Sequence, residues 1–224
     1  MISLQNVTKK YDGRNIGVED VNIEIDAGEF VSIVGPSGTG KTTLVRLLIA
    51  EERPTGGTIE IGGWDISNIS NRNIPHLRRQ IGVVFQDFKL LEKKTVYENF
   101  ALQVAGEKSS KINDIVPKVL DIVGLSHEEN SYPGELSTGQ QQRVVIARSL
   151  VHRPKILVAD EPTGNLDTIN THEVVKILKK INEFGTTIVL VTHDKEVVNN
   201  LNNRVITLEE GKIKADVDQG KYRL

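Results

Sequence analysis

The sequence predicts an α/β fold with a mostly parallel core sheet, an antiparallel β layer at its N-terminal edge and an inserted α-helical subdomain. Three observations predict it. The first third of the chain carries strand-like apolar runs, residues 88–133 carry helical spacing, and strands alternate with helices from residue 134 onward. Such alternation favours a parallel sheet covered by helices. We expect one domain over residues 1–224, with 1–87 and 134–224 as its α/β core and 88–133 as the helical subdomain.

The expected strands of the first third follow two apolar patterns. Residues 21–25 and 58–61 alternate apolar and polar side chains, as half-buried strands do, and the second run ends at a Gly62-Gly63 turn. Residues 30–34 form a more continuous apolar run, which is typical of a strand buried on both faces. A further short strand is expected at 81–85. These early strands indicate the additional antiparallel layer.

Helical spacing covers 96–104 and 112–123, with a polar break at 106–110 between them. The elements expected after this insertion are, in order, a helix at 140–150, a strand at 155–159, a helix at 171–184, a strand at 187–191, a short helix from Asp194 and a hairpin that joins 204–208 to 212–217 around Glu210-Gly211. The long helix carries its apolar residues on one face, namely Val174, Val175, Ile177, Leu178 and Ile181.

The composition excludes several classes of function. The 28 Lys and Arg residues against 30 Asp and Glu give a net charge of -2, which provides no global attraction to nucleic acid or anionic lipid. The absence of cysteine excludes a disulfide scaffold, a thiolate nucleophile and thiolate metal sites. The chain shows no signal-peptide pattern, and no run approaches the roughly 18 apolar residues that a membrane span needs. We therefore expect an intracellular protein without a span of its own.

A phosphate-binding loop is the most specific motif that follows from the residues alone. The pattern G-x-x-x-x-G-K-[ST] is matched by Gly35-Pro36-Ser37-Gly38-Thr39-Gly40-Lys41-Thr42. It follows the expected buried strand and precedes an apolar helix at 44–50, which is the context this motif requires. The backbone amides from about Ser37 to Thr43 and the positive end of that helix can hold the α- and β-phosphates. Lys41 can reach the β- and γ-phosphate oxygens, and the Thr42 hydroxyl can ligate Mg²⁺.

A second element ends in acidic residues. The apolar strand expected at 155–159 runs into Asp160 and Glu161. Open α/β sheets bind ligands at the carboxyl ends of their strands, where these two side chains lie. Asp160 is placed to hold Mg²⁺, directly or through water, and Glu161 can orient and deprotonate an attacking water. Together with the phosphate loop, this strand predicts hydrolysis of a nucleoside triphosphate.

The segment Leu136-Ser137-Thr138-Gly139-Gln140 has the chemistry of a helix start, because Ser137 as N-cap and Gln140 three residues later form a capping box. The same segment, followed by Gln-Gln-Arg-Val-Val-Ile-Ala-Arg, resembles the signature motif of ATP-binding-cassette (ABC) ATPases. The other motifs of that family occur in the family's order, over essentially the whole chain. The resemblance implies a P-loop cassette with a RecA-like core.

Five further residues receive roles from this resemblance. Gln86 resembles the Q-loop glutamine, which implies a catalytic and Mg²⁺-binding role, and Asp167 resembles the D-loop aspartate. His193 resembles the catalytic switch histidine. Tyr11 resembles the aromatic residue that stacks on adenine, with Val18 packed nearby.

In this family two cassettes dimerise head to tail and trap two ATP molecules between them. The resemblance therefore implies an ATP-dependent homodimer, in which the signature residues of one copy (Ser137, Thr138, Gly139 and Gln140) face the phosphate loop of the other. The usual signature has two successive glycines, and here the first is replaced by Thr138. A β-branched residue restricts the backbone where glycine tolerates positive φ, so we expect weaker or slower ATP-driven closure.

Residues 77–91 and 94–99 resemble the bacterial cell-division branch of the ABC ATPases. This implies an integral membrane partner of the FtsX type, control of cell-wall hydrolysis, and a peripheral location on the cytoplasmic face of the cell membrane through that partner only. Residues 160–167 are shared with the cassettes of lipoprotein-releasing and macrolide-type exporters, which form the alternative. A scaffold that uses ATP only as a dimerisation switch is a third possibility, against which Glu161 and His193 argue.

The surface that couples to the membrane partner is expected at residues 87–95. Its apolar residues Phe88, Leu90 and Leu91 either pack on the inserted helices or form a groove for a partner helix. The lysines in the same segment are equally well explained as a solvated basic face or as partner contacts.

Overall fold

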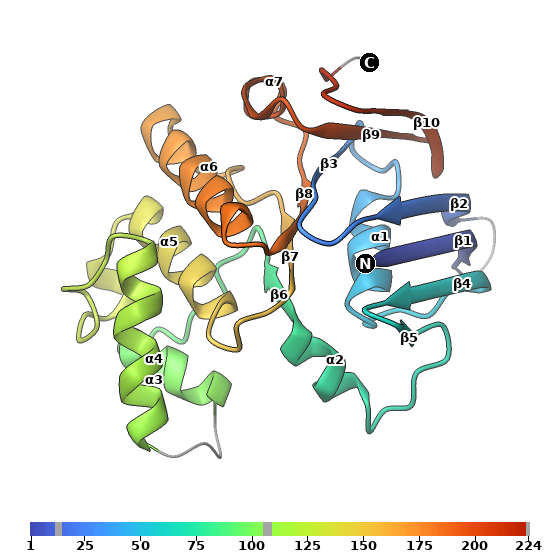
Figure 1. Cartoon of the computed structure of the whole chain (residues 1–224). Helices are drawn as coiled ribbons and strands as arrows, with labels where there is room; N and C mark the ends of the chain where they lie inside the picture. Colours follow the sequence, from blue (N-terminus) through green and yellow to red (C-terminus); the bar gives the residue numbers. More distant parts are fainter. Residues whose placement is uncertain (12–14, 105–108, 223–224) are drawn as a thin grey trace.

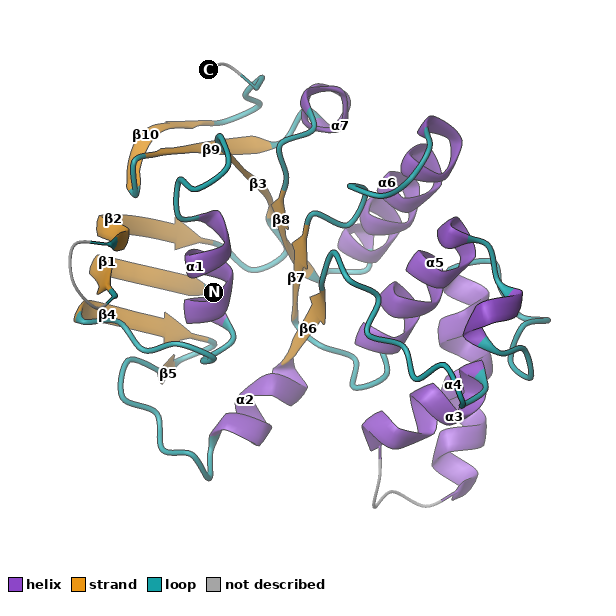
Figure 2. Ribbon diagram, turned by 180° about the vertical axis from the view of Figure 1, so that it is seen from behind, coloured by secondary structure: helices purple, strands orange, loops and turns teal. Residues whose placement is uncertain are grey.

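Two β-sheets lie on either side of helix α1 (Lys41–Leu48), and a group of helices covers the far face of the larger sheet (Figures 1 and 2). The computed structural model describes residues 1–11, 15–104 and 109–222. One apolar cluster fills the space between α1 and both sheets, and a second lies between the larger sheet and the helices. The architecture is the α/β fold that the sequence predicts.

The larger sheet is the mostly parallel core. Its strand order is β10-β9-β3-β8-β7-β6, and only β10 runs antiparallel to its neighbour. The strands are β3 (Phe30–Val34), β6 (Ile81–Val84), β7 (Ile156–Asp160), β8 (Thr187–Val191), β9 (Arg204–Glu209) and β10 (Lys212–Val217). All six were expected from the apolar runs, and the bounds differ by one residue at most.

Alternation along the central strands explains why the sheet is covered on both faces. Within β7, Ile156 and Val158 face the cluster around α1, whereas Leu157 and Ala159 face the helical cluster. Since successive side chains of a strand point to opposite faces, a continuous apolar run is what two covered faces require.

The smaller sheet is the antiparallel layer, with the order β2-β1-β4-β5. Its strands are β1 (Ile2–Lys10), β2 (Ile16–Ile25), β4 (Gly56–Ile61) and β5 (Trp64–Asp65). β1 occupies the centre, where Ile2 pairs with both Ile25 and Ile61. β1 and β5 are not among the elements expected from the sequence, because their apolar alternation is broken or too short.

The remaining helices are α2 (Ile74–Gln80), α3 (Val96–Ala101), η1 (Leu102–Val104), α4 (Ser109–Ile122), η2 (Pro133–Glu135), α5 (Thr138–Ser149), α6 (Thr168–Glu183) and α7 (Lys195–Leu201). The five apolar residues predicted for one face of the long helix are the buried residues of α6. Of the predicted polar break, residues 106–108 lie outside the described residues, and residues 109–110 belong to α4.

Helices α3, α4 and α5 pack together on the side of the core sheet away from α1 (Figure 1). Across residues 1–11, 15–104 and 109–222, no helix combines the length and the apolar character needed to cross a membrane.

Candidate nucleotide-binding site

The phosphate loop joins the end of β3 to the start of α1. Three of its glycines have positive φ: Gly35 (153°), Gly38 (81°) and Gly40 (101°). A Cβ built on Gly40 would overlap the carbonyl oxygen of Gly17, so both backbone conformation and space require glycine there. No side chain caps the first turn of α1, which leaves its N–H groups available to an anion.

Lys41 turns back into this loop. Its buried ammonium donates hydrogen bonds to the carbonyl oxygens of Gly35 (2.7 Å) and Pro36 (2.8 Å). Burial lowers the pKa of Lys41, while the carboxylates of Glu161 and Asp160 act in the opposite direction. The loop is therefore closed around a positive charge.

The two predicted carboxylates occur at the end of β7. Burial and the neighbouring Glu161 raise the pKa of Asp160 to about 6, against the attraction of Lys41 and Arg46. Glu161 follows with a positive φ of 49°, and its N–H donates to the Val191 carbonyl oxygen (2.8 Å) on β8. A non-glycine residue with this backbone is uncommon, and such conformations cluster at functional sites. The turn aims the Glu161 side chain out of the strand direction.

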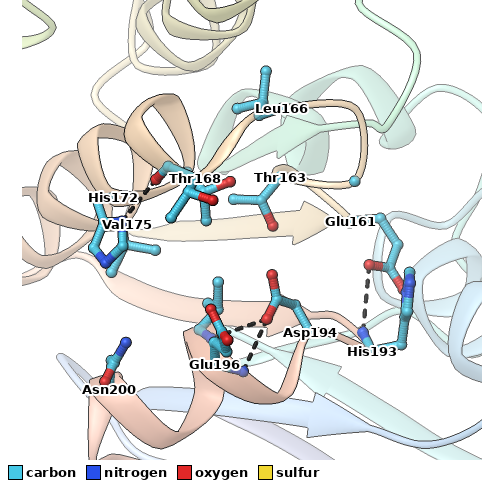
Figure 3. A pocket seen from close by; sticks show the side chains of 13 residues that line it. Glu161, Thr163, Leu166, Thr168, His172, Val175, His193, Asp194, Glu196 and Asn200 are labelled. Carbon is cyan, nitrogen blue, oxygen red and sulfur yellow. Dashed lines mark hydrogen bonds and ion pairs between the residues drawn. The ribbon is translucent and has the colours of Figure 1, made fainter.

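Glu161 and His193 lie face to face. The Nδ1 atom of His193 is 2.7 Å from Glu161 Oε1, and the backbone N–H of His193 donates to Oε2 at 3.4 Å (Figure 3). Because a carboxylate only accepts hydrogen bonds, this geometry requires the hydrogen on Nδ1. β7 and β8 are parallel neighbours, so the residues that follow their carboxyl ends meet at one edge of the sheet.

A cavity of about 690 Å³ brings most of the predicted residues together. It is lined by Tyr11, Asn15, Ile16, Gly17, Ser37, Gly38, Gly40, Lys41, Thr42, Thr43, Gln86, Asp160, Glu161 and His193. The predicted residues Gly35, Pro36 and Thr39 lie beneath this lining, where the Pro36 carbonyl accepts hydrogen bonds from both Lys41 and Thr39. Val18 is fully buried next to the loop.

Three lining residues were not anticipated: Asn15, Ile16 and Gly17. A Cβ built on Gly17 would lie 2.7 Å from the Thr43 side chain and 2.9 Å from the Tyr11 ring, so this glycine lets Tyr11 reach the loop. The Tyr11 hydroxyl is 3.4 Å from Thr43 Oγ1. The segment that could have revealed them is the polar turn after Tyr11, which carries no recognisable motif.

The signature residues do not line this cavity. Ser137 is the N-cap of α5: its Oγ accepts from the Gln140 N–H (3.3 Å), and its own N–H donates to Gln140 Oε1 (2.9 Å). The predicted capping box is therefore confirmed. Its satisfied geometry presents the N-terminus of α5 away from the chain's own phosphate loop.

The backbone argument about Thr138 is wrong for this chain. Thr138 is the first residue of α5 and is not among the described residues with positive φ. Helical backbone at this position needs no glycine, so the β-branched side chain causes no strain there. The neighbour Gly139 is the restricted position, because it is buried against Asn170.

Asp167 caps α6 in the same manner as Ser137 caps α5. Its Oδ1 accepts from the Asn170 N–H (2.9 Å), and its Oδ2 accepts from the Asn170 side-chain amide (2.6 Å). These hydrogen bonds lower the pKa of Asp167. The segment that leads to this cap runs past Glu161 and His193 around a second, smaller cavity (Figure 3).

The expected coupling segment divides into a buried and an exposed part. Leu90 is buried and Phe88 packs against the helical cluster, whereas Leu91 is 50% exposed. Asn99 clamps the exposed part, since its side chain bonds both the N–H and the carbonyl of Leu91 and two further carbonyls at 94 and 95. Packing on the inserted helices thus accounts for two of the three apolar residues.

The sequence profile of the ABC transporter family matches residues 18–164. The chain belongs to this family, and it is an ATPase of the family that binds ATP. It is 49% identical over 224 residues to the cell division ATP-binding protein FtsE of Bacillus subtilis (strain 168), covering 99% of this chain and 98% of the relative. The corresponding protein of Mycobacterium tuberculosis is 47% identical over 225 residues, with 99% and 98% covered.

Two similar solved structures are the dimeric structure of MJ0796, a bacterial ABC transporter cassette, and its post-hydrolysis state bound to ADP and Pi. Both are 35% identical and cover 99% of this chain and 100% of the other, with TM-scores of 0.88 and 0.87. The resemblance to ABC ATPases and to their cell-division branch is thereby confirmed, and so is the cassette fold.

Proposed function

We propose that this chain is the ATP-hydrolysing subunit of an FtsEX-like membrane complex that regulates cell-wall hydrolysis during bacterial cell division. The relatives named FtsE, matched over nearly their full length, support the assignment. The exporter alternative is not favoured. One observation carries the mechanism: the cavity collects the phosphate loop, Asp160, Glu161 and His193, while the signature helix points elsewhere.

Within one chain, the proposed roles follow from the lining of the cavity. Lys41 and the N–H groups of the loop hold the phosphates, and Tyr11 provides a face for the adenine ring. Glu161 accepts the proton of the attacking water, and His193 fixes the orientation of that carboxylate.

The cavity also offers oxygen donors suited to Mg²⁺. The Thr42 hydroxyl, the Gln86 carboxamide and the Asp160 carboxylate all line it, and Mg²⁺ prefers oxygen ligands of these kinds. We propose these three residues as its ligands. When bound, the ion would neutralise charge on the transferred phosphoryl group.

A second copy would complete the site. Ser137, Thr138, Gly139 and Gln140 sit at the N-terminus of a helix whose positive end faces outward, which suits contact with the γ-phosphate held by the partner. Two similar solved structures are dimeric cassettes. ATP would close the homodimer, and hydrolysis would reopen it.

We further propose that the helical residues 88–133 and the adjoining cleft receive an FtsX-like membrane protein. The cleft has a volume of about 480 Å³ and is lined by Phe85 and by the cations Arg78, Arg79, Lys89 and Arg148. Arg148 donates to the carbonyl oxygens of Lys89 (2.7 Å) and Phe88 (3.0 Å), so it fixes the segment that ends in exposed Leu91. The chain would sit on the cytoplasmic face of the membrane through this partner only, with no nucleic-acid ligand.

Co-purification tests the partner surface. With the membrane protein co-expressed, Leu91→Asp should reduce its recovery at least tenfold, because a charge replaces an exposed apolar contact, while ATP binding stays unchanged. Val217→Asp is the matched control, since Val217 is equally exposed (50%) on β10. Equal recovery with both variants would contradict the proposed surface.

A further inference from the structure

Gly139 and Asn170 form a contact between the two helices that carry the signature segment and the Asp167 cap. A Cβ built on Gly139 would overlap Oδ1 and Cγ of Asn170 and would lie 3.0 Å from its Cβ. No other glycine within the described α-helices is packed in this way, and its φ is not positive. The space behind Gly139, rather than its backbone conformation, therefore excludes a side chain.

Asn170 is itself held in place from the other side. Its side-chain amide donates to Asp167 Oδ2 (2.6 Å), and its backbone N–H donates to Oδ1 (2.9 Å). The carboxamide is thus fixed between Asp167 and the backbone of Gly139. A methyl group at position 139 would displace the carboxamide and break its bond to Asp167.

A second contact joins the same two helices one turn further along. Arg143 on α5 and Glu173 on α6 form an ion pair at 3.5 Å. Residues 139 and 143, like 170 and 173, lie on the same face of their helices. α5 and α6 run side by side in both views (Figures 1 and 2). The helices are therefore in register at two points, of which the Gly139 contact is the one next to both caps.

The Asp167 cap leads directly to the catalytic residues. Thr163, Leu166 and Thr168 line the same small cavity as Glu161 and His193, as Figure 3 shows. A shift of Asp167 is therefore transmitted over a short, packed segment to the carboxylate that activates water.

We propose that Asn170 is a positioning residue that locks the signature segment to the D-loop of the same chain, and that Asn170 imposes glycine at position 139. This rests on the proposed function, in which the signature segment binds the ATP of a second copy. Through Asn170, contact of the signature segment with that ATP reaches the Glu161–His193 pair of its own chain. The two sites of the dimer are thereby linked.

A size-exchange cycle tests this. Gly139→Ala, Asn170→Ala and the double variant are compared for ATP turnover and, in a Glu161→Gln background, for ATP-driven dimerisation. Gly139→Ala should lower kcat and dimerisation at least tenfold, because its methyl displaces Asn170. The double variant should recover at least fivefold over Gly139→Ala, because the space is vacated. The affinity of the single protomer for ATP should be the same in all four proteins.

Gly134→Ala is the matched control. Gly134 lies in η2 just ahead of the signature segment, without positive φ, and a Cβ built there meets no atom within 4 Å. This variant should keep wild-type turnover. A double variant as impaired as Gly139→Ala would overturn the proposal, since the glycine would then be required by something other than Asn170.

The cycle separates the two levels of inference. If the Glu161→Gln parent forms no dimer with ATP, the proposed function fails, and the lock is judged by the Tm of the nucleotide-free proteins. A loss of Tm in Gly139→Ala that shrinks when Asn170→Ala is present supports the contact. Additive losses overturn it.

Discussion

The nucleotide cavity and the signature segment are two halves of one proposed reaction site, and they are built by opposite means. The cavity draws on residues from 11 to 193, which the parallel sheet collects at the carboxyl ends of its strands. The signature segment is shaped within four residues, by the reciprocal bonds of Ser137 and Gln140. Changes to the cavity should therefore affect chemistry, and changes to the signature segment should affect helix stability and dimerisation together.

The largest effect is expected at Glu161, within the cavity. Glu161→Gln keeps the size of the side chain but removes the base, so phosphate release should fall at least ~100-fold. Binding of ATP should persist, and an ATP-bound dimer should accumulate. Phosphate release and size-exclusion chromatography measure both, with the Tm as a control for folding. A fall of less than tenfold would remove Glu161 from the proposed role.

The next effect separates the cap from its second use. Ser137→Ala removes the acceptor for the Gln140 N–H and should cost about 1 kcal/mol of unfolding free energy. Thr95→Ala removes the equivalent acceptor of the capping box that begins α3 and is the matched control. Both should lose similar stability in urea, but only Ser137→Ala should also weaken ATP-driven dimerisation. Equal dimerisation would confine Ser137 to capping.

Asp160 tests the cost of gathering charge in the cavity. Its pKa is raised from 3.8 to about 6 by burial and Glu161. The folded state binds this proton more tightly than the unfolded state, so its contribution to stability decreases as pH rises from about 4 to 6. Asp160→Asn removes that loss.

The shift of pKa corresponds to about 3 kcal/mol at 1.36 kcal/mol per unit, which solvent screening of this partly exposed group reduces to about 1 kcal/mol. Nucleotide-free Asp160→Asn should therefore be more stable than wild type at pH 7 by that amount, and equally stable near pH 4. Urea unfolding at both pH values measures it. A variant that is less stable at pH 7 would contradict the sign.

The smallest effect is expected at Thr138. Because this residue has helical backbone, Thr138→Gly should change the unfolding free energy by less than about 1 kcal/mol and leave dimerisation unchanged. A marked gain in ATP-driven dimerisation would instead restore the idea that Thr138 slows closure.

The sequence predicts these two halves unequally. The strand at 187–191 and the buried face of α6 follow from apolar periodicity, and the Ser137 cap follows from residue spacing, because all three are local patterns. α2 and β5 are short and carry no such pattern. The Gly139 contact joins residues 31 positions apart through the packing of α5 on α6, which no local pattern encodes.

Lys41 changes how nucleotide affinity is to be understood. Because its ammonium already donates to two loop carbonyls, an arriving phosphate replaces existing hydrogen bonds instead of meeting a bare charge. Binding is then an exchange reaction, whose net free energy is much smaller than the attraction between ammonium and phosphate. The reverse exchange is equally available once the nucleotide has been cleaved. A loop that recloses on its own lysine releases product readily, as a repeating motor requires.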